Sequence, residues 1–470
     1  MPEAVWGLAD LAHNTLVIVG VGREGQAITE VLQAGDSPPH MVAIDGAEGD
    51  HAARFRARWG DTVPLVILEG EESPIPPSVA RATVAVVSPG VAPTNWLHRW
   101  VSALGIPLTT SSALFVADHR QSMVGITGSK GKSTVTTLIH QLLEASGEKV
   151  SIGGNMGIPL QGLEPQDRQV VELSSYQCHY LQVSPDVVVL SALFPEHLDW
   201  HGDTEAYFAA KLSLVSHQPR IVIANGDDAI LRAELTKRYP DVSVEWVGEG
   251  FPWHLEVEGE DSWLCHGTDR LFRTGESALL GAHNHRNMLL ALAGAAATGA
   301  LDTDAIAPVL SAFPGLAHRL EKIGDPSGVV FVNDSLATNP HAAAAALVAC
   351  SSPGMVWLVG GFDRGVNYQV LIEQVVRQTP RHIVGLPESG PRLVELFREA
   401  LTEAGLRDQV SLHTASSMLE AVTYARGLAE PGDYVLLSPG APSFGIYRDY
   451  QHRADDFRSA IEHTQTKDTA

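Results

Sequence analysis

The chain has 470 residues, which is too long for one hydrophobic core and predicts about three domains. Its formal charge of −23 at pH 7 argues against nucleic acid as a partner, because nucleic-acid phosphates would be repelled. The three cysteines, Cys178, Cys265 and Cys350, are far apart and lack metal or redox spacing, so we expect no disulfide framework and a reducing, cytoplasmic location.

Neither a signal peptide nor a membrane span is expected. The N-terminal sequence MPEAVWGLADL contains acidic residues and no basic segment. The longest apolar stretch, residues 342–361, is interrupted by the sequence Ser-Ser-Pro-Gly, so it predicts a helix, a turn and a strand.

The first segment, residues 1–111, begins with a strand, a glycine turn and a helix. Residues 15–20 (TLVIVG) form an apolar strand, and Gly20, Gly22 and Gly25 follow in GVGREG. A second strand ends at Asp45, and this spacing taken alone indicates a dinucleotide site, as in an NAD-dependent oxidoreductase. The signal is weak, because other phosphate-bearing ligands use the same turn. A third strand ends in the turn that begins at Ser88, at the same predicted sheet edge.

The second segment, residues 112–314, contains GITGSKGKST, from Gly125 to Thr134. It lies between an apolar strand and a helix that begins near Lys132, which is the context of a phosphate-binding loop. Lys132 would place a charge at the phosphates, and Ser133 or Thr134 would offer a hydroxyl to Mg²⁺. Five residues rather than the usual four separate Gly125 from Gly131, so a strict pattern search would miss this loop.

Two further strand ends of this segment carry possible metal ligands. Glu172 ends one apolar strand, and His197 follows another in the loop LFPEHLDWHG. A carboxylate and an imidazole downstream of a phosphate loop suit Mg²⁺ held against ATP phosphates. The alternatives are a zinc site made of His197, Asp199 and His201, or loop histidines with no ligand.

Other polar residues of this segment are ambiguous from local pattern. Lys211 lies on a helix among apolar residues, and a helical lysine usually faces solvent. Asn284 is a plausible helix cap, whereas Asn287 could contact a nucleotide base.

The third segment, residues 315–470, shows four apolar strands, each followed by a turn rich in glycine or proline. Ligand-binding groups of parallel sheets lie at the carboxyl ends of strands, so these turns are candidate site walls. Asp334 lies in the first of these turns, NDSLATN, and Arg319 lies in GLAHRLE, just past the presumed domain boundary. The tail from Glu462 onward is predicted to be disordered.

Five motifs occur in one order over nearly the whole chain: the phosphate loop, VELSSYQ, HNHRN, HR and ND. In this combination the sequence resembles the Mur ligase family, and within it the branch that adds glutamate to UDP-N-acetylmuramoyl-L-alanine. The resemblance implies an ATP-dependent, amide-bond-forming enzyme of cytoplasmic peptidoglycan precursor synthesis. It also implies an α/β fold of three domains: a Rossmann-like UDP-sugar-binding domain (1–111), a central P-loop ATPase-type domain with a mostly parallel sheet (112–314), and a Rossmann-like domain that receives the amino acid (315–470).

The resemblance also assigns roles by position. The implied ATP-binding residues are Gly128, Gly131, Lys132, Ser133, Thr134, Asn287, Arg319 and Asp334. The implied ligands of two Mg²⁺ ions are Ser133, Glu172, His197 and Lys211, the last matching the family's carbamylated lysine. The implied catalytic residues are Lys132, Lys211, His197 and Arg319, and the implied UDP-sugar contacts are Gly22, Arg23, Glu24, Ser88, Asn155 and Ser174.

Departures from the family pattern fall on turns expected to surround the amino acid. Leu336 stands where enzymes that use D-glutamate have a lysine, and Arg364 replaces a second lysine. Ser443 and Tyr447 lie in SPGAPSFGIY, and with Arg364 they are the implied glutamate contacts. Inverting the Cα of the substrate requires the cations and donors that receive it to move. The phrases LFPEHLDWHG, GGFDRG and SPGAPSFG resemble those of the subgroup that attaches L-glutamate. Such a product would require a separate epimerase.

Other functions remain open at this stage. The chain could be an ordinary D-glutamate-adding enzyme or a non-catalytic UDP-sugar-binding protein. A folylpolyglutamate synthase-like ligase would not need the N-terminal glycine turn, and an oxidoreductase would leave the phosphate loop unexplained.

Overall fold

A computed structural model describes residues 5–156, 158–164, 166–259 and 261–465. Its strands form three separate sheets, which follow one another along the chain. Most neighbouring strands are parallel and alternate with helices, so the α/β class predicted from the sequence is confirmed. No helix within the described residues is both long enough and apolar enough to cross a membrane.

The first sheet has five parallel strands in the order β3-β2-β1-β4-β5. Its elements are β1 (Thr15–Val19), α1 (Arg23–Ala34), β2 (His40–Asp45), α2 (Asp50–Trp59), β3 (Leu65–Ile67), β4 (Val84–Val87), α3 (Trp96–Ser102) and β5 (Leu108–Thr109). Strands β2 and β3 lie on one side of β1, and strands β4 and β5, which follow them in the chain, lie on its other side. The carboxyl ends of β1 and β4 are therefore a topological switch point, where α/β sheets bind ligands.

The second sheet has nine strands in the order β14-β13-β12-β11-β10-β9-β6-β8-β7. Its strands are β6 (Met123–Thr127), β7 (Val150–Gly154), β8 (Arg168–Glu172), β9 (Val187–Leu190), β10 (Ile221–Asn225), β11 (Val244–Val247), β12 (Trp253–Glu258), β13 (Asp261–His266) and β14 (Asp269–Arg273). The last three strands form an antiparallel extension that the sequence analysis did not identify.

The helices between residues 111 and 312 are α4 (Ser111–His119), α5 (Lys132–Ala145), α6 (Ser175–Cys178), α7 (Leu198–His201), α8 (Thr204–Leu212), α9 (Ala229–Arg238), α10 (Ala282–Ala296) and α11 (Ile306–Ala312). The central strands β6, β8 and β9 are almost wholly buried. Strands that are covered on both faces favour apolar residues, as in the sequence VVVL of β9.

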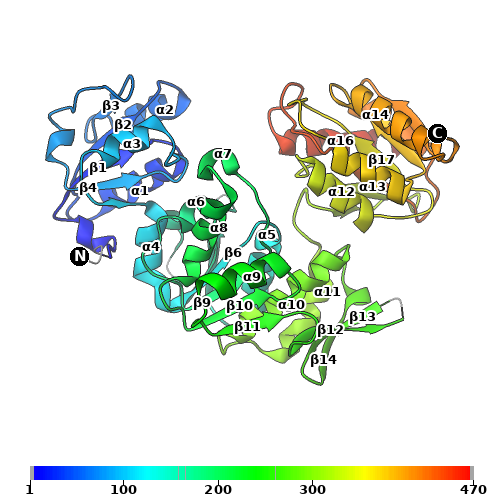
Figure 1. Ribbon diagram of the computed structural model, residues 1–470, viewed down its shortest axis with the longest axis horizontal. Coiled ribbons are helices and arrows are strands. Elements are labelled where there is room, and N and C mark those ends of the chain that lie inside the picture. The colour runs from blue at the N-terminus through cyan, green and yellow to red at the C-terminus, as the bar shows by residue number, and fades with distance from the viewer. Residues whose placement is uncertain (1–4, 157, 165, 260, 466–470) are drawn as a thin grey trace. The chain divides into compact units, whose positions relative to one another are not determined.

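The third sheet has the order β15-β16-β20-β17-β18-β19, with an antiparallel edge strand, β15. Its elements are β15 (Glu321–Ile323), β16 (Val330–Asn333), α12 (Pro340–Ala349), β17 (Val356–Val359), α13 (Gln369–Gln378), β18 (His382–Gly385), α14 (Gly390–Glu403), β19 (Ser411–Thr414), α15 (Met418–Arg426), β20 (Tyr434–Leu437) and α16 (Tyr450–Gln465). One hydrophobic core joins this sheet to α12, α13 and α14, and a second joins it to α15 and α16. Figure 1 labels strand β17 of this sheet and the helices α12, α13, α14 and α16.

One local expectation requires correction, and another is confirmed. Helix α16 continues to Gln465, so the prediction of disorder from Glu462 is wrong as far as that residue, and the last five residues lie outside the described part. The apolar stretch 342–361 forms a helix, a turn and a strand, as predicted.

The chain separates into two compact units, one of residues 1–276 with 285–311 and one of residues 277–284 with 312–470. The second unit contains the segment predicted as the third domain, residues 315–470, together with residues 277–284 and 312–314, and that domain boundary stays a prediction. The predicted boundary between residues 111 and 112 lies within the first unit and stays a prediction, because the first two sheets there belong to one unit.

Candidate functional site

The turn between β6 and α5 has the features of a phosphate-binding loop. Gly131, with φ of +88°, lies directly before α5, which begins at Lys132. The Lys132 Nζ donates hydrogen bonds to the carbonyl oxygens of Gly128, at 2.9 Å, and Ser129, at 3.2 Å. The loop therefore joins the amide groups of a helix N-terminus to a lysine charge, a combination that binds phosphate oxygens.

Both predicted loop glycines are required by close packing. A Cβ on Gly131 would lie 2.5 Å from the Asn287 Oδ1, and one on Gly128 would overlap the Ser191 Oγ. Asn287, on α10, therefore lies beside the loop, as a nucleotide-contacting residue would. Sequence analysis missed Ser191, whose hydroxyl donates to the Lys130 carbonyl oxygen at 2.6 Å. Its place at the carboxyl end of β9 was the available signal.

A buried carboxylate lies next to the loop. Glu172, at the end of β8, is 2 % exposed. Its Oε2 accepts a hydrogen bond from the Ser133 Oγ at 2.6 Å, and its Oε1 accepts one from the Asn155 Nδ2 at 2.9 Å. The fold thus brings together three residues that the sequence had placed in two different ligand sites. Thr134, the next residue of α5, is buried.

The oxygen-rich group around Glu172 suits a hard cation better than zinc. Carboxylate and hydroxyl oxygens are the ligands that Mg²⁺ takes in nucleotide sites. No group of three or more His, Cys, Asp or Glu side chains in the described residues is arranged to hold a metal ion. The His201 Nε2 lies 2.9 Å from the Ser175 Oγ, and burial lowers the pKa of His201 to about 4. The zinc alternative of His197, Asp199 and His201 therefore has no support in the geometry.

His197 is exposed and lies directly before α7, with a left-handed φ of +54°. Its ring lies 5.3 Å from that of Tyr176, edge to face, and partial burial lowers its pKa. A lowered pKa keeps the imidazole neutral at pH 7, the form that binds metals. Its assignment as a Mg²⁺ ligand stays a prediction.

Lys211 is buried, contrary to the usual behaviour of a helical lysine. It is 3 % exposed on α8, and its Nζ lies 3.5 Å from the Thr127 Oγ1 at the end of β6. Burial, followed by the charge of Lys132, lowers the pKa of Lys211 to about 7. A substantial fraction of the amine is therefore uncharged near neutral pH, and only an uncharged amine can react with carbon dioxide. The position suits the predicted carbamylation.

At the switch point of the first sheet, the glycine turn and the serine turn are adjacent. A Cβ on Gly20 would lie 3.1 Å from the Ser88 Cβ, so β1 and β4 present both turns together. The Asp45 carboxylate accepts a hydrogen bond from the Val21 amide at 2.9 Å. Asp45 therefore supports the glycine turn. In an NAD site the equivalent carboxylate would instead accept a hydrogen bond from the ribose hydroxyl.

Two residues predicted to contact the UDP-sugar, Glu24 and Ser174, form hydrogen bonds with other residues of the protein. Glu24, on α1, accepts hydrogen bonds from the Gln177 Nε2 at 3.0 Å and the Ser112 Oγ at 3.3 Å. Burial is the main influence on Glu24 and raises its pKa. Ser174 caps α6 through the Gln177 amide. Gly22 and Arg23 begin α1, and a UDP-sugar role for all these residues stays a prediction.

The predicted glutamate contacts belong to the second unit. Ser443 and Tyr447 line one pocket of that unit, together with Gly361 and Arg453. The Tyr447 hydroxyl donates to the Asp456 Oδ2 at 2.7 Å. Arg364 is exposed, and its guanidinium lies 5.9 Å from the Phe444 ring centre. Arg453 was missed, because a single arginine on a helix carries no motif.

Two predicted ATP contacts, Arg319 and Asp334, also belong to the second unit. Asp334 is 5 % exposed and accepts a hydrogen bond from the Ser438 Oγ at 2.7 Å. Burial raises its pKa to about 7. The assignment of both residues to ATP stays a prediction. Asn284 is not a helix cap, because it lies inside α10, which begins at Ala282. The Asn284 side chain donates a hydrogen bond to the Leu280 carbonyl oxygen.

The fold and the loop define an α/β protein of the phosphate-loop class, and comparison with known proteins specifies the family. Residues 126–295 match the Mur ligase middle domain, and residues 318–441 match the Mur ligase glutamate ligase domain. The chain belongs to the Mur ligase family, as its sequence motifs indicated.

Two relatives are similar over almost their whole length. A protein of a Micromonospora species is 41% identical over 97% of this chain and 98% of its own, and one of Salinispora tropica is 38% identical over 97% and 99%. Both are named UDP-N-acetylmuramoyl-L-alanine--L-glutamate ligase. The crystal structure of the MurF ligase from Thermotoga maritima in complex with ADP has a TM-score of 0.57 at 17% identity, covering 97% of this chain and 99% of that one. This likeness confirms the fold.

Proposed function

We propose that this chain is an ATP-dependent ligase that joins L-glutamate to UDP-N-acetylmuramoyl-L-alanine in peptidoglycan precursor synthesis. The observation that carries the proposal is the likeness, over 97% of the chain, to relatives named for this reaction. The phosphate loop and the buried Glu172 beside it support the ATP-dependent step. We place the reaction in the cytoplasm, where ATP is made available to biosynthetic enzymes.

The reaction that we propose has two steps. The carboxylate of the alanyl group attacks the γ-phosphate of ATP, so that a new P–O bond forms and the bond to ADP breaks. The glutamate amine then attacks the acyl phosphate, forms the amide and releases inorganic phosphate and a proton. Both steps bring negative groups together, so their barriers depend on fixed positive charge and on oriented donors.

The residues of the first unit would supply this charge. Lys132 would bind the β- and γ-phosphates once its Nζ leaves the Gly128 and Ser129 carbonyl oxygens. Ser133 and Glu172, with His197 and a carbamylated Lys211, would hold Mg²⁺. Bound Mg²⁺ would neutralise phosphate charge and orient the oxygens.

The preference for L-glutamate is supported by the turns of the second unit. Leu336 follows β16 and supplies no cation, whereas Arg364 follows β17 as a planar guanidinium. A guanidinium binds carboxylates through two parallel hydrogen bonds, unlike the point charge of a lysine. The pattern thus differs from that expected for D-glutamate. Incorporated L-glutamate would then require an epimerase that acts on the product.

The test is to incubate the protein with UDP-N-acetylmuramoyl-L-alanine, ATP and Mg²⁺, adding L- or D-glutamate separately. Phosphate release and the ligated product are measured. We expect activity with L-glutamate at a rate at least about a hundredfold above that with D-glutamate, because the wrong enantiomer leaves charged groups unpaired. Activity with D-glutamate alone would make the chain a D-glutamate-adding enzyme and refute the interpretation of Leu336 and Arg364.

A further inference from the structure

Arg453 is a buried cation that the proposed chemistry does not use. It lies on α16, is 1 % exposed and lines the pocket that contains Ser443 and Tyr447. Burial lowers its pKa only to about 10, so the guanidinium remains charged at neutral pH. A buried charge is costly unless its partners repay the lost hydration, so the partners of Arg453 need an explanation.

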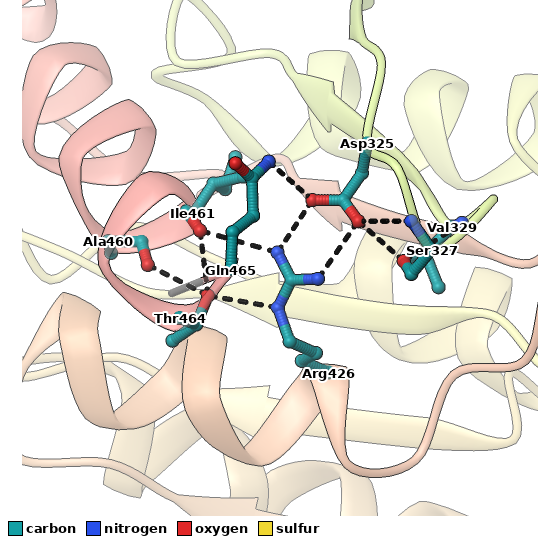
Figure 2. A network of polar contacts seen from close by, with 8 residues as sticks. All are labelled: Asp325, Ser327, Val329, Arg426, Ala460, Ile461, Thr464 and Gln465. Carbon is teal, nitrogen blue, oxygen red and sulfur yellow. Dashed lines mark hydrogen bonds and ion pairs between the residues drawn. The ribbon is translucent and has the colours of Figure 1, made fainter. Parts of the chain in front are cut away.

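Another arginine of the same unit, Arg426, shows the usual way in which a protein compensates a buried charge. Arg426, at the end of α15, pairs with the Asp325 carboxylate through two hydrogen bonds of 2.9 and 2.7 Å. The Thr464 hydroxyl and the Gln465 side chain complete this network, which fixes the end of α16 (Figure 2). Arg426 is therefore explained by charge pairing within the fold.

Arg453 makes a different set of hydrogen bonds, to one hydroxyl and two backbone carbonyl oxygens, all of which are neutral. Its Nε donates to the Ser335 Oγ at 3.0 Å, and one terminal nitrogen donates to the Ser335 carbonyl oxygen at 2.9 Å. The other terminal nitrogen donates to the Ala441 carbonyl oxygen at 3.0 Å. A rigid planar fork with five donors can serve these three acceptors at once, which a lysine cannot do.

The acceptors belong to different turns of the predicted glutamate site. Ser335 lies in the turn after β16, next to Leu336, and Ala441 lies in the turn after β20, two residues before Ser443. Strands β16 and β20 are neighbours in the sheet, so these turns leave the same edge. Arg453 thus links these two turns beyond the strand ends, where the Asp334 amide donates to the Leu437 carbonyl oxygen and the Ser438 Oγ donates to the Asp334 carboxylate.

The turn after β17 joins the same assembly. A Cβ on Gly361 would lie 3.0 Å from the Arg453 Nη1, so this glycine gives the guanidinium its room. The Phe362 amide donates to the Pro442 carbonyl oxygen at 2.9 Å, which ties this turn to the one containing Ala441. Arg364 follows two residues later. Three turns that carry Leu336, Arg364 and Ser443 therefore meet around one buried guanidinium.

We propose that Arg453 is a positioning residue for the incoming amino acid, acting through Ser335 and Ala441 to hold the three turns in one arrangement. This role rests on the proposed function. The groups that receive glutamate must keep a fixed geometry while its amine approaches the acyl phosphate, since a misplacement of about 1 Å can cost about a hundredfold in rate. Arg453 supplies that rigidity through the hydrogen bonds of its guanidinium.

The test compares three variants of the full-length protein: Arg453→Met, Arg453→Lys and the control Arg426→Met. The first removes the fork at similar volume, the second keeps the charge without the fork, and the third removes a buried arginine elsewhere in the same unit. KM is measured for glutamate, ATP and the UDP-sugar, with kcat and the melting temperature. Amide hydrogen exchange is followed in residues 334–339, 360–366 and 439–445.

We expect Arg453→Met to raise KM for glutamate at least about tenfold and to leave the other two KM values within about twofold. Exchange should rise in all three turns. Arg453→Lys should show a smaller change of the same kind, and it carries the test if the methionine variant does not fold. Arg426→Met should lower the melting temperature but leave KM for glutamate and exchange in the turns unchanged.

Two results would overturn the positioning role. One is an unchanged KM for glutamate and unchanged exchange in a folded Arg453 variant. The other is an equal rise of KM for glutamate in Arg426→Met, which would show that general destabilisation is the cause. A wild-type protein that ligates neither enantiomer refutes the proposed function instead, and hydrogen exchange, which needs no substrate, then decides whether Arg453 holds the turns.

Discussion

Single residues in this protein change their chemistry mainly through burial. Lys211 and Asp334 carry opposite charges, yet desolvation is the main cause of the pKa shift of each, and it brings both values to about 7. Burial penalises the charged form, so a lysine loses its proton more easily and an aspartic acid holds it more strongly. Neither shift follows from local sequence, because both depend on the elements packed around the side chain.

We predict that Asp334→Asn changes how stability depends on pH. Between the ordinary value of 3.8 and about 7, folded Asp334 holds a proton that the unfolded chain releases. The proton on Asp334 therefore stabilises the folded state. Its contribution to the free energy of unfolding is complete below pH 3.8 and is lost as the pH rises through about 7. The melting temperature of the wild type relative to the variant should fall by several degrees between pH 5 and 8.

The exposed Asp408, in the same unit, provides the control. Asp408→Asn should leave the difference in melting temperature nearly constant over this pH range. A constant difference for Asp334→Asn as well would show that the proton on Asp334 does not couple to folding.

Among the elements, α5 shows how two similar glycines differ in importance. Gly131 precedes the helix with φ of +88°, and Gly147 follows it with φ of +91°. An alanine at either site pays about 1–2 kcal/mol for the left-handed conformation. Only at Gly131 does a Cβ also meet another side chain, that of Asn287.

Gly131→Ala should therefore raise KM for ATP at least about tenfold, because the loop or Asn287 must move. The matched variant Gly147→Ala should lower the melting temperature without changing KM for ATP by more than about twofold. Steady-state kinetics at saturating glutamate and UDP-sugar would measure both. Equal KM values for the two variants would mean that the loop does not bind the nucleotide.

At the scale of the whole molecule, the second unit has its own sheet and two hydrophobic cores. A sheet covered on both faces can fold independently. We predict that a fragment of residues 315–470 shows strand and helix signals by circular dichroism and a single cooperative thermal transition. Its Asp325→Asn form, which breaks the buried pair with Arg426, should melt about 5–10 °C lower. A fragment without a cooperative transition would refute the predicted boundary at residue 315.

Much of the fold could be predicted from the chain, for a local reason. Short apolar runs bounded by glycine and proline turns, such as Met123–Thr127 and Tyr434–Leu437, form buried strands here, and the turns after them carry polar residues. The antiparallel extension β12 to β14 was missed, because its strands alternate irregularly and are partly exposed. The family followed from motif order, which the comparisons confirmed.

The candidate site also has one part that the sequence predicted and another that only the tertiary structure revealed. The sequence by itself determined the phosphate loop, because glycine, lysine and serine at that spacing between a strand and a helix have one common use. Only the tertiary structure placed Glu172 between Ser133 and Asn155, and only it showed the contacts of Arg453 with Ser335 and Ala441. The physical reason is the distance along the chain over which the interactions act. Backbone conformation depends on neighbours along the chain, whereas desolvation and the convergence of turns depend on residues that only folding brings together.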